Sequence, residues 1–290
     1  MTLPLELPVV DHHCHLSPNA EGVAAAARFA RAGGTHLFLA TQEYTGEVPR
    51  TLDGYRAQFE ITERLAQRIR AETDVVAYVV VAPYPVDLVR ASEAIGVAAA
   101  VDLQRSALDL AGRWVEEQRA VALGEVGRPH FPVDSALVNA AEQVFRHALA
   151  VARDAGCPAV VHSEDLSADG YRQLAALAAS ESFPLGKLVK HYAKSSVTPT
   201  ESAGIVPSYL ARRELVGEVL GRPGPWFLET DFLDDPRRKG AVLDIETIPR
   251  RAMAAVAKDP ANADRLRVPF ESAVDSVYGL RPVVPTRGQR

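Results

Sequence analysis

The sequence has 290 residues, of which 47% are hydrophobic and 24% are charged, and these proportions exclude a disordered or collagen-like chain. Its 32 basic and 37 acidic residues give a net charge of −5, which does not favour a polyanionic partner. Two cysteines are too few for a disulfide framework, and no run of about 18 apolar residues predicts a membrane span. We therefore expect one domain, residues 1–290, in the cytoplasm, with no membrane association and no obligate protein partner.

Short β-branched segments alternate with longer segments of helical periodicity along the whole chain. The eight expected strands are 7–10, 35–40, 75–81, 120–126, 158–162, 187–190, 204–206 and 226–230. The expected helices are 20–32, 55–72, 86–118, 134–155, 167–180, 208–220 and 249–258. This repeat indicates parallel βαβ units, and its length predicts an α/β fold of the closed (β/α)8, or TIM-barrel, type. No Gly-x-Gly-x-x-Gly follows the first strand, which argues against a dinucleotide-binding fold.

The first strand runs into a segment rich in histidine, Asp11-His12-His13-Cys14-His15. Because side chains alternate along a strand, Asp11, His13 and His15 share one face, and Cys14 packs on the other. Two imidazoles at positions i and i+2 can bind one metal ion. The alternative is a polar strand end whose histidines make ordinary hydrogen bonds.

Four further candidate ligands, Glu125, His162, His191 and Asp231, each lie at the carboxyl end of an expected strand. In a parallel barrel these ends converge on one face, where the loops build the active site. Together with His13 and His15 they make four histidines and two carboxylates. This set exceeds what one four-coordinate zinc ion needs, and it predicts two metal ions bridged by a carboxylate.

An ordered set of five motifs spans nearly the whole chain. The motifs are Asp11-x-His13-x-His15, Gly124-Glu125-x-Gly127, His162 after an apolar strand, His191 after another, and Glu229-Thr230-Asp231 followed by Pro236. Together they are far more specific than any one of them. The sequence resembles the TatD-related metal-dependent hydrolases of the amidohydrolase superfamily, and most closely an archaeal-type branch of that group.

The resemblance implies a TIM barrel, two divalent ions and hydrolysis. It places His13, His15 and Asp231 around one ion and His162 and His191 around the other, with Glu125 as the bridge. A water molecule activated by the ions would attack a phosphodiester, and Asp231 would act as general base. The implied substrates are DNA ends, cleaved by a 3′–5′ deoxyribonuclease of the TatD type. Zinc, manganese and magnesium all remain candidate ions.

Two loops depart from the pattern of the bacterial nucleases. Arg128 and His130 follow Glu125 and could bind an anionic group, or could belong to a loop fixed by prolines. Tyr192 and Lys194 follow His191 and could contact a base and its phosphate, or could be structural. These four residues are the candidate substrate contacts.

Asp11 and Glu229 each lie two residues before a candidate ligand and face the same way. They could accept hydrogen bonds that orient the ligand imidazoles, or could satisfy backbone donors.

Two other functions stay open. The same site could hydrolyse a small lactone, amide or phosphate ester, as a lactonase, amidohydrolase or phosphoesterase does, and the net charge and altered loops favour this alternative. The barrel could instead be a non-catalytic metal-binding scaffold. A complete set of six ligands argues against a scaffold, because a degraded site is expected to lose some of them.

Overall fold

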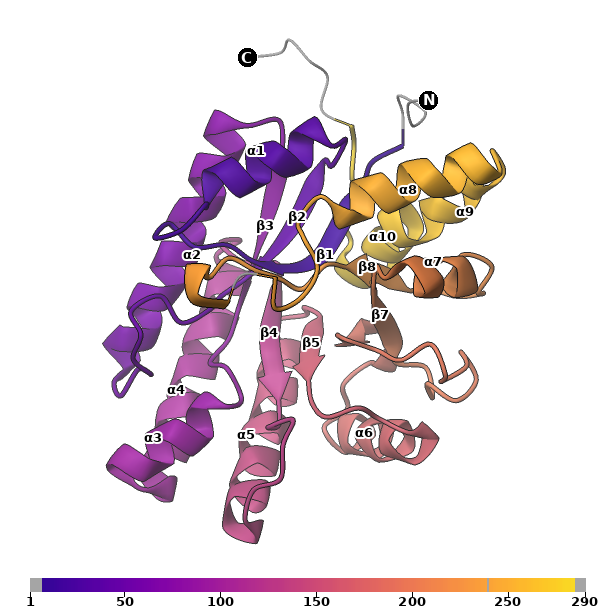
Figure 1. Cartoon of the computed structure of the whole chain (residues 1–290). Helices are drawn as coiled ribbons and strands as arrows, with labels where there is room; N and C mark the ends of the chain where they lie inside the picture. Colours follow the sequence, from indigo (N-terminus) through magenta and orange to yellow (C-terminus); the bar gives the residue numbers. More distant parts are fainter. Residues whose placement is uncertain (1–6, 239, 285–290) are drawn as a thin grey trace. The chain divides into compact units, whose positions relative to one another are not determined.

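The computed structural model describes residues 7–238 and 240–284 (Figure 1). The chain divides into two compact units, which we describe separately. Unit 1 comprises the described residues of Met1–Leu39, Arg64–Tyr78 and Pro207–Arg290, and unit 2 comprises Ala40–Glu63 and Val79–Val206.

Strands and helices alternate along the chain, as predicted (Figure 1). The strands are β1 (Val10–His15), β2 (His36–Ala40), β3 (Val76–Val81), β4 (Ala122–Gly127), β5 (Ala159–His162), β6 (Leu188–Lys190), β7 (Val206–Leu210), β8 (Phe227–Glu229) and β9 (Phe232–Leu233). The α-helices are α1 (Val23–Arg31), α2 (Leu52–Glu72), α3 (Asp87–Ile95), α4 (Val97–Glu116), α5 (Ser135–Asp154), α6 (Ala168–Ser180), α7 (Arg213–Val219), α8 (Thr247–Lys258), α9 (Asn262–Arg267) and α10 (Ala273–Tyr278). Three shorter helical segments are η1 (Leu185–Lys187), η2 (Pro236–Arg238) and η3 (Val268–Ser272).

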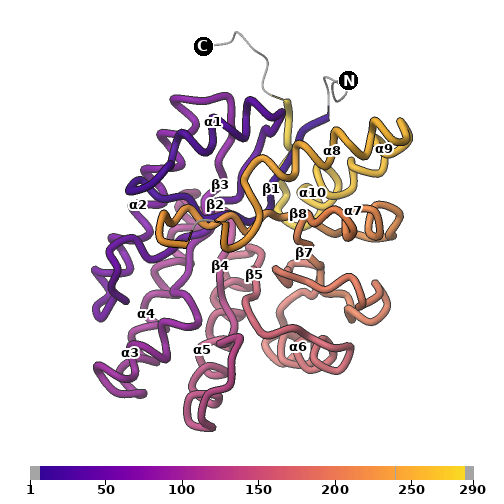
Figure 2. The backbone as a smooth tube through the Cα atoms, viewed as in Figure 1, coloured from indigo at the N-terminus to yellow at the C-terminus, as the bar shows by residue number. Residues whose placement is uncertain are grey.

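In unit 1, β1 pairs in parallel with both β2 and β9, and β7 pairs in parallel with β8. The segments α8, α9, η3 and α10 pack on one another in the C-terminal part of this unit (Figure 2). His12 stacks on Phe227 with 4.0 Å between ring centroids, and its Nε2 lies 2.7 Å from the hydroxyl of Tyr278. His12 therefore belongs to the unit's core and not to the candidate ligands beside it.

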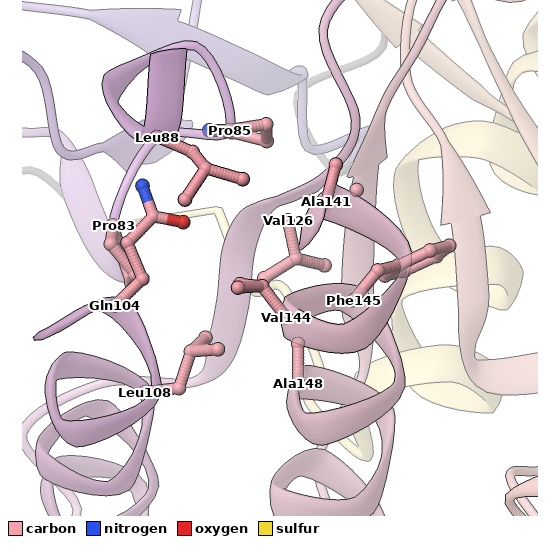
Figure 3. A pocket seen from close by; sticks show the side chains of 11 residues that line it. Pro83, Pro85, Leu88, Gln104, Leu108, Val126, Ala141, Val144, Phe145 and Ala148 are labelled. Atoms are coloured by element: carbon pink, nitrogen blue, oxygen red, sulfur yellow. The ribbon is translucent and has the colours of Figure 1, made fainter. Parts of the chain in front are cut away.

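In unit 2, β3, β4, β5 and β6 form a parallel ladder in that order. Helices α4 and α5 pack against each other and against β4. A cavity of about 10 Å³ lies between them, and Leu88, Leu108, Val126, Val144 and Phe145 are among its apolar lining residues (Figure 3). Because neighbouring side chains on a strand alternate, the helix-facing Val126 leaves Glu125 to the opposite side of β4.

Several boundaries differ from the prediction. The first strand is not 7–10 but β1, which contains the histidine-rich segment itself and is buried along its length. The helix expected over 86–118 is broken at Gly96, whose φ of 82° ends α3 before α4 begins.

The expected seventh strand, 204–206, overlaps β7 only at Val206, and the helix after it begins at Arg213 instead of 208. Helices α9 and α10 lie beyond the last expected helix. Both differences fall where short elements lack the long periodic pattern on which the prediction depends.

Within the two described ranges, none of the helices combines the length and the hydrophobicity that a membrane-spanning segment needs.

Candidate functional site

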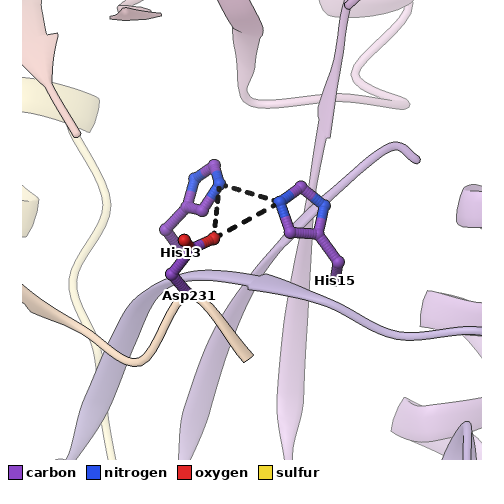
Figure 4. Close-up of side chains that lie close together, drawn as sticks. All are labelled: His13, His15 and Asp231. Carbon is purple, nitrogen blue, oxygen red and sulfur yellow. Dashed lines mark hydrogen bonds and ion pairs between the residues drawn. The ribbon is translucent and has the colours of Figure 1, made fainter. Parts of the chain in front are cut away.

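Unit 1 gathers three of the predicted ligands, His13, His15 and Asp231 (Figure 4). The Nε2 atoms of His13 and His15 lie 3.1 Å apart. Oδ1 of Asp231 lies 3.9 Å from Nε2 of His13 and 3.7 Å from Nε2 of His15. Ligand atoms at about 2.1 Å from a tetrahedral ion are about 3.4 Å from one another, so the spacing of these three atoms suits one ion.

The backbone of unit 1 fixes this triangle. His13 and His15 project from the same face of β1, as the alternation predicted. The backbone N–H of Asp231 donates to the carbonyl of His13 at 2.9 Å. Asp231 has a φ of 48°, a left-handed conformation that non-glycine residues adopt at a cost and that is found at functional sites.

Asp11, two residues before His13 on β1, is fully buried. Its carboxyl accepts hydrogen bonds from the backbone N–H groups of His13 at 3.2 Å and Thr230 at 3.0 Å, and from the Thr230 hydroxyl at 2.5 Å. Burial raises the pKa of Asp11 to about 7, although these hydrogen bonds oppose the rise. Asp11 therefore supports the backbone on both sides of the ligands, which is the structural alternative to orienting an imidazole.

Glu229 is buried on β8, and its Oε2 accepts a hydrogen bond of 2.5 Å from the Ser208 hydroxyl on the neighbouring strand β7. This contact joins the middle of β7 to the carboxyl end of β8, two residues before Asp231. Ser208 and Thr230 were not predicted as hydrogen-bond partners of these carboxyl groups, because the sequence carries no signal of the partner of a hydroxyl group.

Unit 2 gathers the other three predicted ligands, Glu125, His162 and His191. Oε1 of Glu125 lies 2.8 Å from Nδ1 of His162 and 3.0 Å from Nε2 of His191, and these two nitrogens are 3.2 Å apart. The three side chains are between 5% and 12% exposed. Burial opposes ionisation of Glu125, but the two facing imidazoles outweigh it and hold the pKa of this carboxyl well below its usual range.

The ends of three neighbouring strands position this second cluster. Gly127 of β4 is in register with His162 of β5, after an irregularity between Gly124 and Val126. The N–H of His191 continues the ladder by donating to the Val161 carbonyl at 3.2 Å. The buried ammonium of Lys190 donates to the carbonyl of His191 at 2.6 Å.

The outer nitrogen of His162, Nε2, faces two further side chains. It lies 2.8 Å from Nδ1 of His130 and 3.3 Å from the hydroxyl of Tyr84. His130 was predicted as a substrate contact, and the structure places it against a candidate ligand. Tyr84 was missed, although its place just after β3 is one where functional residues of parallel barrels gather.

The other predicted substrate contacts lie on the loops of unit 2. Arg128 forms a two-pronged ion pair with Glu164, with distances of 2.9 and 2.5 Å. Lys194 lies 2.7 Å from a carboxylate oxygen of Asp165. Tyr192 is 37% exposed, has a φ of 55°, and meets the edge of the His191 ring at a centroid distance of 6.0 Å.

Each cluster combines imidazole nitrogens with a carboxylate oxygen, and in each the potential ligand atoms point toward one another. Such mixed sets suit zinc, manganese or iron better than calcium, which prefers oxygen ligands alone. The residues present therefore fit a divalent metal ion in each cluster.

Comparisons with known proteins identify a family that covers nearly the whole chain. The model of the family described as TatD related DNase matches residues 10–279. An uncharacterised protein of Methanocaldococcus jannaschii is 29% identical over 280 residues, which are 94% of this chain and 96% of that protein.

Solved structures show the same fold. A TatD homologue from Escherichia coli has a TM-score of 0.64 at 17% identity, covering 94% of this chain and 98% of its own. A TatD-like protein from Archaeoglobus fulgidus has a TM-score of 0.61 at 15% identity, covering 92% and 99%. These likenesses confirm the predicted α/β fold of the TatD type. The chain belongs to the TatD-related DNase family.

Proposed function

We propose that this protein is a metal-dependent hydrolase that cleaves an ester bond. The observation that carries the proposal is the presence, in each unit, of a buried cluster in which two imidazoles and a carboxylate converge within 2.8–3.9 Å. Burying charged or polar groups lowers the stability of a protein unless the groups pair or bind a metal ion. Two such clusters at strand ends therefore indicate a functional site. We propose one divalent ion for each cluster.

A bound divalent ion lowers the pKa of a water molecule and so supplies a nucleophile at neutral pH. The side chain of Asp231 is 16% exposed and is the carboxylate of the unit 1 cluster. We assign it the role of general base: it takes the proton of the attacking water and returns it to the leaving oxygen as the ester bond breaks. A bridging role for Glu125 and the identity of the ions remain predictions from the family resemblance.

The substrate that the family supports is a phosphodiester, with DNA ends cleaved in the 3′–5′ direction as the specific candidate. Arg128, His130, Tyr192 and Lys194 remain proposed substrate contacts in this function. The ion pairs of Arg128 with Glu164 and of Lys194 with Asp165 would then have to open when a phosphate binds.

A second candidate, a small uncharged ester or lactone, is favoured by the charges around the unit 2 cluster. The loops that follow β3, β4, β5 and β6 are residues 82–86, 128–134, 163–167 and 191–205. They contain two basic residues, Arg128 and Lys194, and four acidic ones, Asp134, Glu164, Asp165 and Glu201. Both basic groups are paired with carboxylates. Polyanions bind through unpaired cations, so this part of the surface suits a small neutral substrate better than a DNA strand.

The test is hydrolysis by protein that has been stripped with a chelator and reloaded with Mg, Mn or Zn in turn. The substrates are an end-labelled single-stranded oligonucleotide, a nitrophenyl phosphodiester, a nitrophenyl carboxylate ester and a γ-lactone. Asp231→Asn serves as the control for contaminating enzymes. We expect metal-dependent hydrolysis that this variant lacks.

Each outcome decides a point. Stepwise shortening of the oligonucleotide establishes the exonuclease, and turnover of the small esters alone establishes the second candidate. Metal binding without turnover of any substrate overturns the enzyme and leaves the metal-binding scaffold.

The cytoplasm remains the proposed location, because Cys14 and Cys157 are free and buried, as expected in a reducing compartment.

A further inference from the structure

We propose that His130 is a positioning residue that holds the imidazole of His162 in the tautomer able to bind a metal ion. The inference deepens the proposed function, because it rests on the unit 2 cluster being a metal site. It assigns His130 a role other than the substrate contact that the sequence suggested.

The orientation of the His162 ring shows which nitrogen serves the cluster. Nδ1 lies 2.8 Å from Oε1 of Glu125 and 3.2 Å from Nε2 of His191, so it is the ligand atom. Nε2 lies on the far side of the ring and faces His130 and Tyr84.

A neutral imidazole carries one N–H, and a nitrogen that binds a metal ion must offer its lone pair. When Nδ1 of His162 binds the ion, the ring proton lies on Nε2. That N–H needs an acceptor, and Nδ1 of His130 is 2.8 Å away, with the two rings inclined at 71°. His130 therefore accepts from His162 and carries its own proton on Nε2. Histidine ligands usually donate their second N–H to a hydrogen-bond acceptor, which fixes both tautomer and ring orientation, and here the acceptor is an imidazole nitrogen.

Tyr84 is the weaker partner of the same N–H. Its hydroxyl lies 3.3 Å from Nε2 of His162, compared with 2.8 Å for His130. Hydrogen bonds weaken as they lengthen beyond about 3 Å, so His130 has the larger influence on the tautomer. The effect of removing the Tyr84 hydroxyl should accordingly be smaller.

The loop that carries His130 is anchored to His162 by its backbone as well. The N–H of Arg128 donates to the carbonyl of His162 at 3.0 Å. Pro129 and Pro132 flank His130 closely and restrict the backbone dihedral φ on both sides. The same short loop thus contacts His162 at its backbone carbonyl and at its outer ring nitrogen. These two contacts fix the position of His130 relative to the His162 ring.

The first test measures zinc binding to the metal-free, full-length protein by competition with a chelating dye. Wild type is compared with His130→Leu, which removes the acceptor, and with His130→Asn, whose side-chain carbonyl can replace Nδ1. We expect His130→Leu to weaken one zinc site by about 10- to 100-fold and His130→Asn to stay within about 3-fold of wild type. Tyr84→Phe should fall between them.

His147→Leu is the matched control, because His147 lies on α5 and pairs with Asp109 at 2.7 Å, apart from the cluster. It should bind zinc as wild type does. Equal zinc affinity in His130→Leu and wild type would overturn the proposal. Circular dichroism establishes that each variant folds, and His130→Asn keeps the test informative if His130→Leu does not.

The second test reads the tautomer directly. Long-range proton–nitrogen NMR spectra of the zinc-loaded protein show the N–H on Nε2 of His162, and the His162 signals are assigned by their loss in His162→Gln. We expect an Nε2–H that exchanges slowly with water in wild type and in His130→Asn, and faster exchange in His130→Leu. The same exchange rate in all three proteins would contradict the role of His130. Wild type that binds no zinc would instead overturn the metal site itself, so the two failures can be told apart.

Discussion

Gly127 lies so close to His162 that no side chain can stand between them. A Cβ atom built on Gly127 would lie 2.2 Å from the carbonyl oxygen of His162, and the φ of Gly127 is 130°. The two residues are in register on β4 and β5. The position of the candidate ligand His162 therefore depends on the absence of a side chain at Gly127, which lies two residues after the candidate ligand Glu125.

Gly127→Ala should therefore destabilise the protein and disturb the unit 2 cluster. The clash is with backbone, which cannot rotate away, and the backbone conformation is one that alanine adopts only with strain. We expect the free energy of unfolding to fall by about 3 kcal/mol or more in urea titrations, with a parallel loss of zinc affinity. Gly156→Ala is the control, because Gly156 also has a positive φ (67°) but has open space around it. It should cost only about 1 kcal/mol. Equal losses in the two variants would contradict the role of the close approach.

The strand–helix order and the six candidate ligands could be predicted because each depends on local pattern. β-branched runs indicate buried strands, and ligands at strand ends follow from the geometry of parallel βαβ units. The start of β1 was predicted too early for the same reason. The residues just before Val10 are apolar, as in a strand. The strand itself is rich in histidine, and a histidine-rich segment is also typical of a solvent-exposed strand end, so its burial was not evident from the sequence.

The partners of the candidate substrate contacts could not be predicted. Arg128 and Glu164 are 36 residues apart, and no pattern links them. The contact between Tyr84 and His162 spans 78 residues. Such pairings depend on how separate loops close over the strand ends, and this is decided by packing that one sequence does not display.

Glu125→Ala should remove metal from the unit 2 cluster. It takes away the carboxylate that faces both His162 and His191 and leaves two neutral imidazoles, which bind a divalent ion far more weakly. Metal analysis after dialysis should show at least one ion fewer per chain than wild type. Glu142→Ala, an exposed substitution on α5, controls for the handling of the protein. A variant that retains the wild-type metal content would show that Glu125 is not a ligand.

Asp231→Asn should abolish turnover and retain at least one ion. The amide keeps the shape of the side chain but cannot take a proton from water, and general-base catalysis typically contributes 10²–10⁴-fold. We expect kcat to fall by at least about 100-fold on whichever ester the wild type hydrolyses, with metal content measured on the same sample. Asp235→Asn, two residues after the end of β9, should keep its activity, since Asp235 pairs with Arg237. Unchanged turnover in Asp231→Asn would refute the assigned base.

Asp234→Ala should loosen the loop that follows β1. The buried Asp234 carboxylate accepts three backbone N–H groups, from Ser17 at 3.0 Å, Glu21 at 3.1 Å and Gly22 at 2.8 Å. Removing it leaves these donors without their acceptor, at about 1 kcal/mol or more each, so the free energy of unfolding should fall by about 3 kcal/mol. Hydrogen exchange should accelerate at the three amides. Normal protection there, together with unchanged stability, would contradict this account.

Asp87 should make the protein less stable as pH rises. Burial raises the pKa of this carboxyl to about 7, and the nearby Glu43 adds to the rise, while Arg90 and the Tyr55 hydroxyl oppose it. In the unfolded chain the pKa returns to about 3.8, so between pH 4 and 7 the folded state keeps a proton that the unfolded state has released. Stability therefore falls across this window, by at most about 4 kcal/mol.

Asp87→Asn should remove that dependence, because the amide resembles the protonated acid at every pH. The difference in unfolding free energy between the variant and wild type isolates Asp87 from other buried groups. One of these is His36, whose pKa burial lowers to about 4 and whose effect on stability has the opposite sign, rising between pH 4 and 6.5. In urea titrations the variant should match wild type near pH 4 and exceed it near pH 8. A difference that stays constant from pH 4 to 8 would mean that Asp87 is ionised in the folded protein throughout, despite its burial.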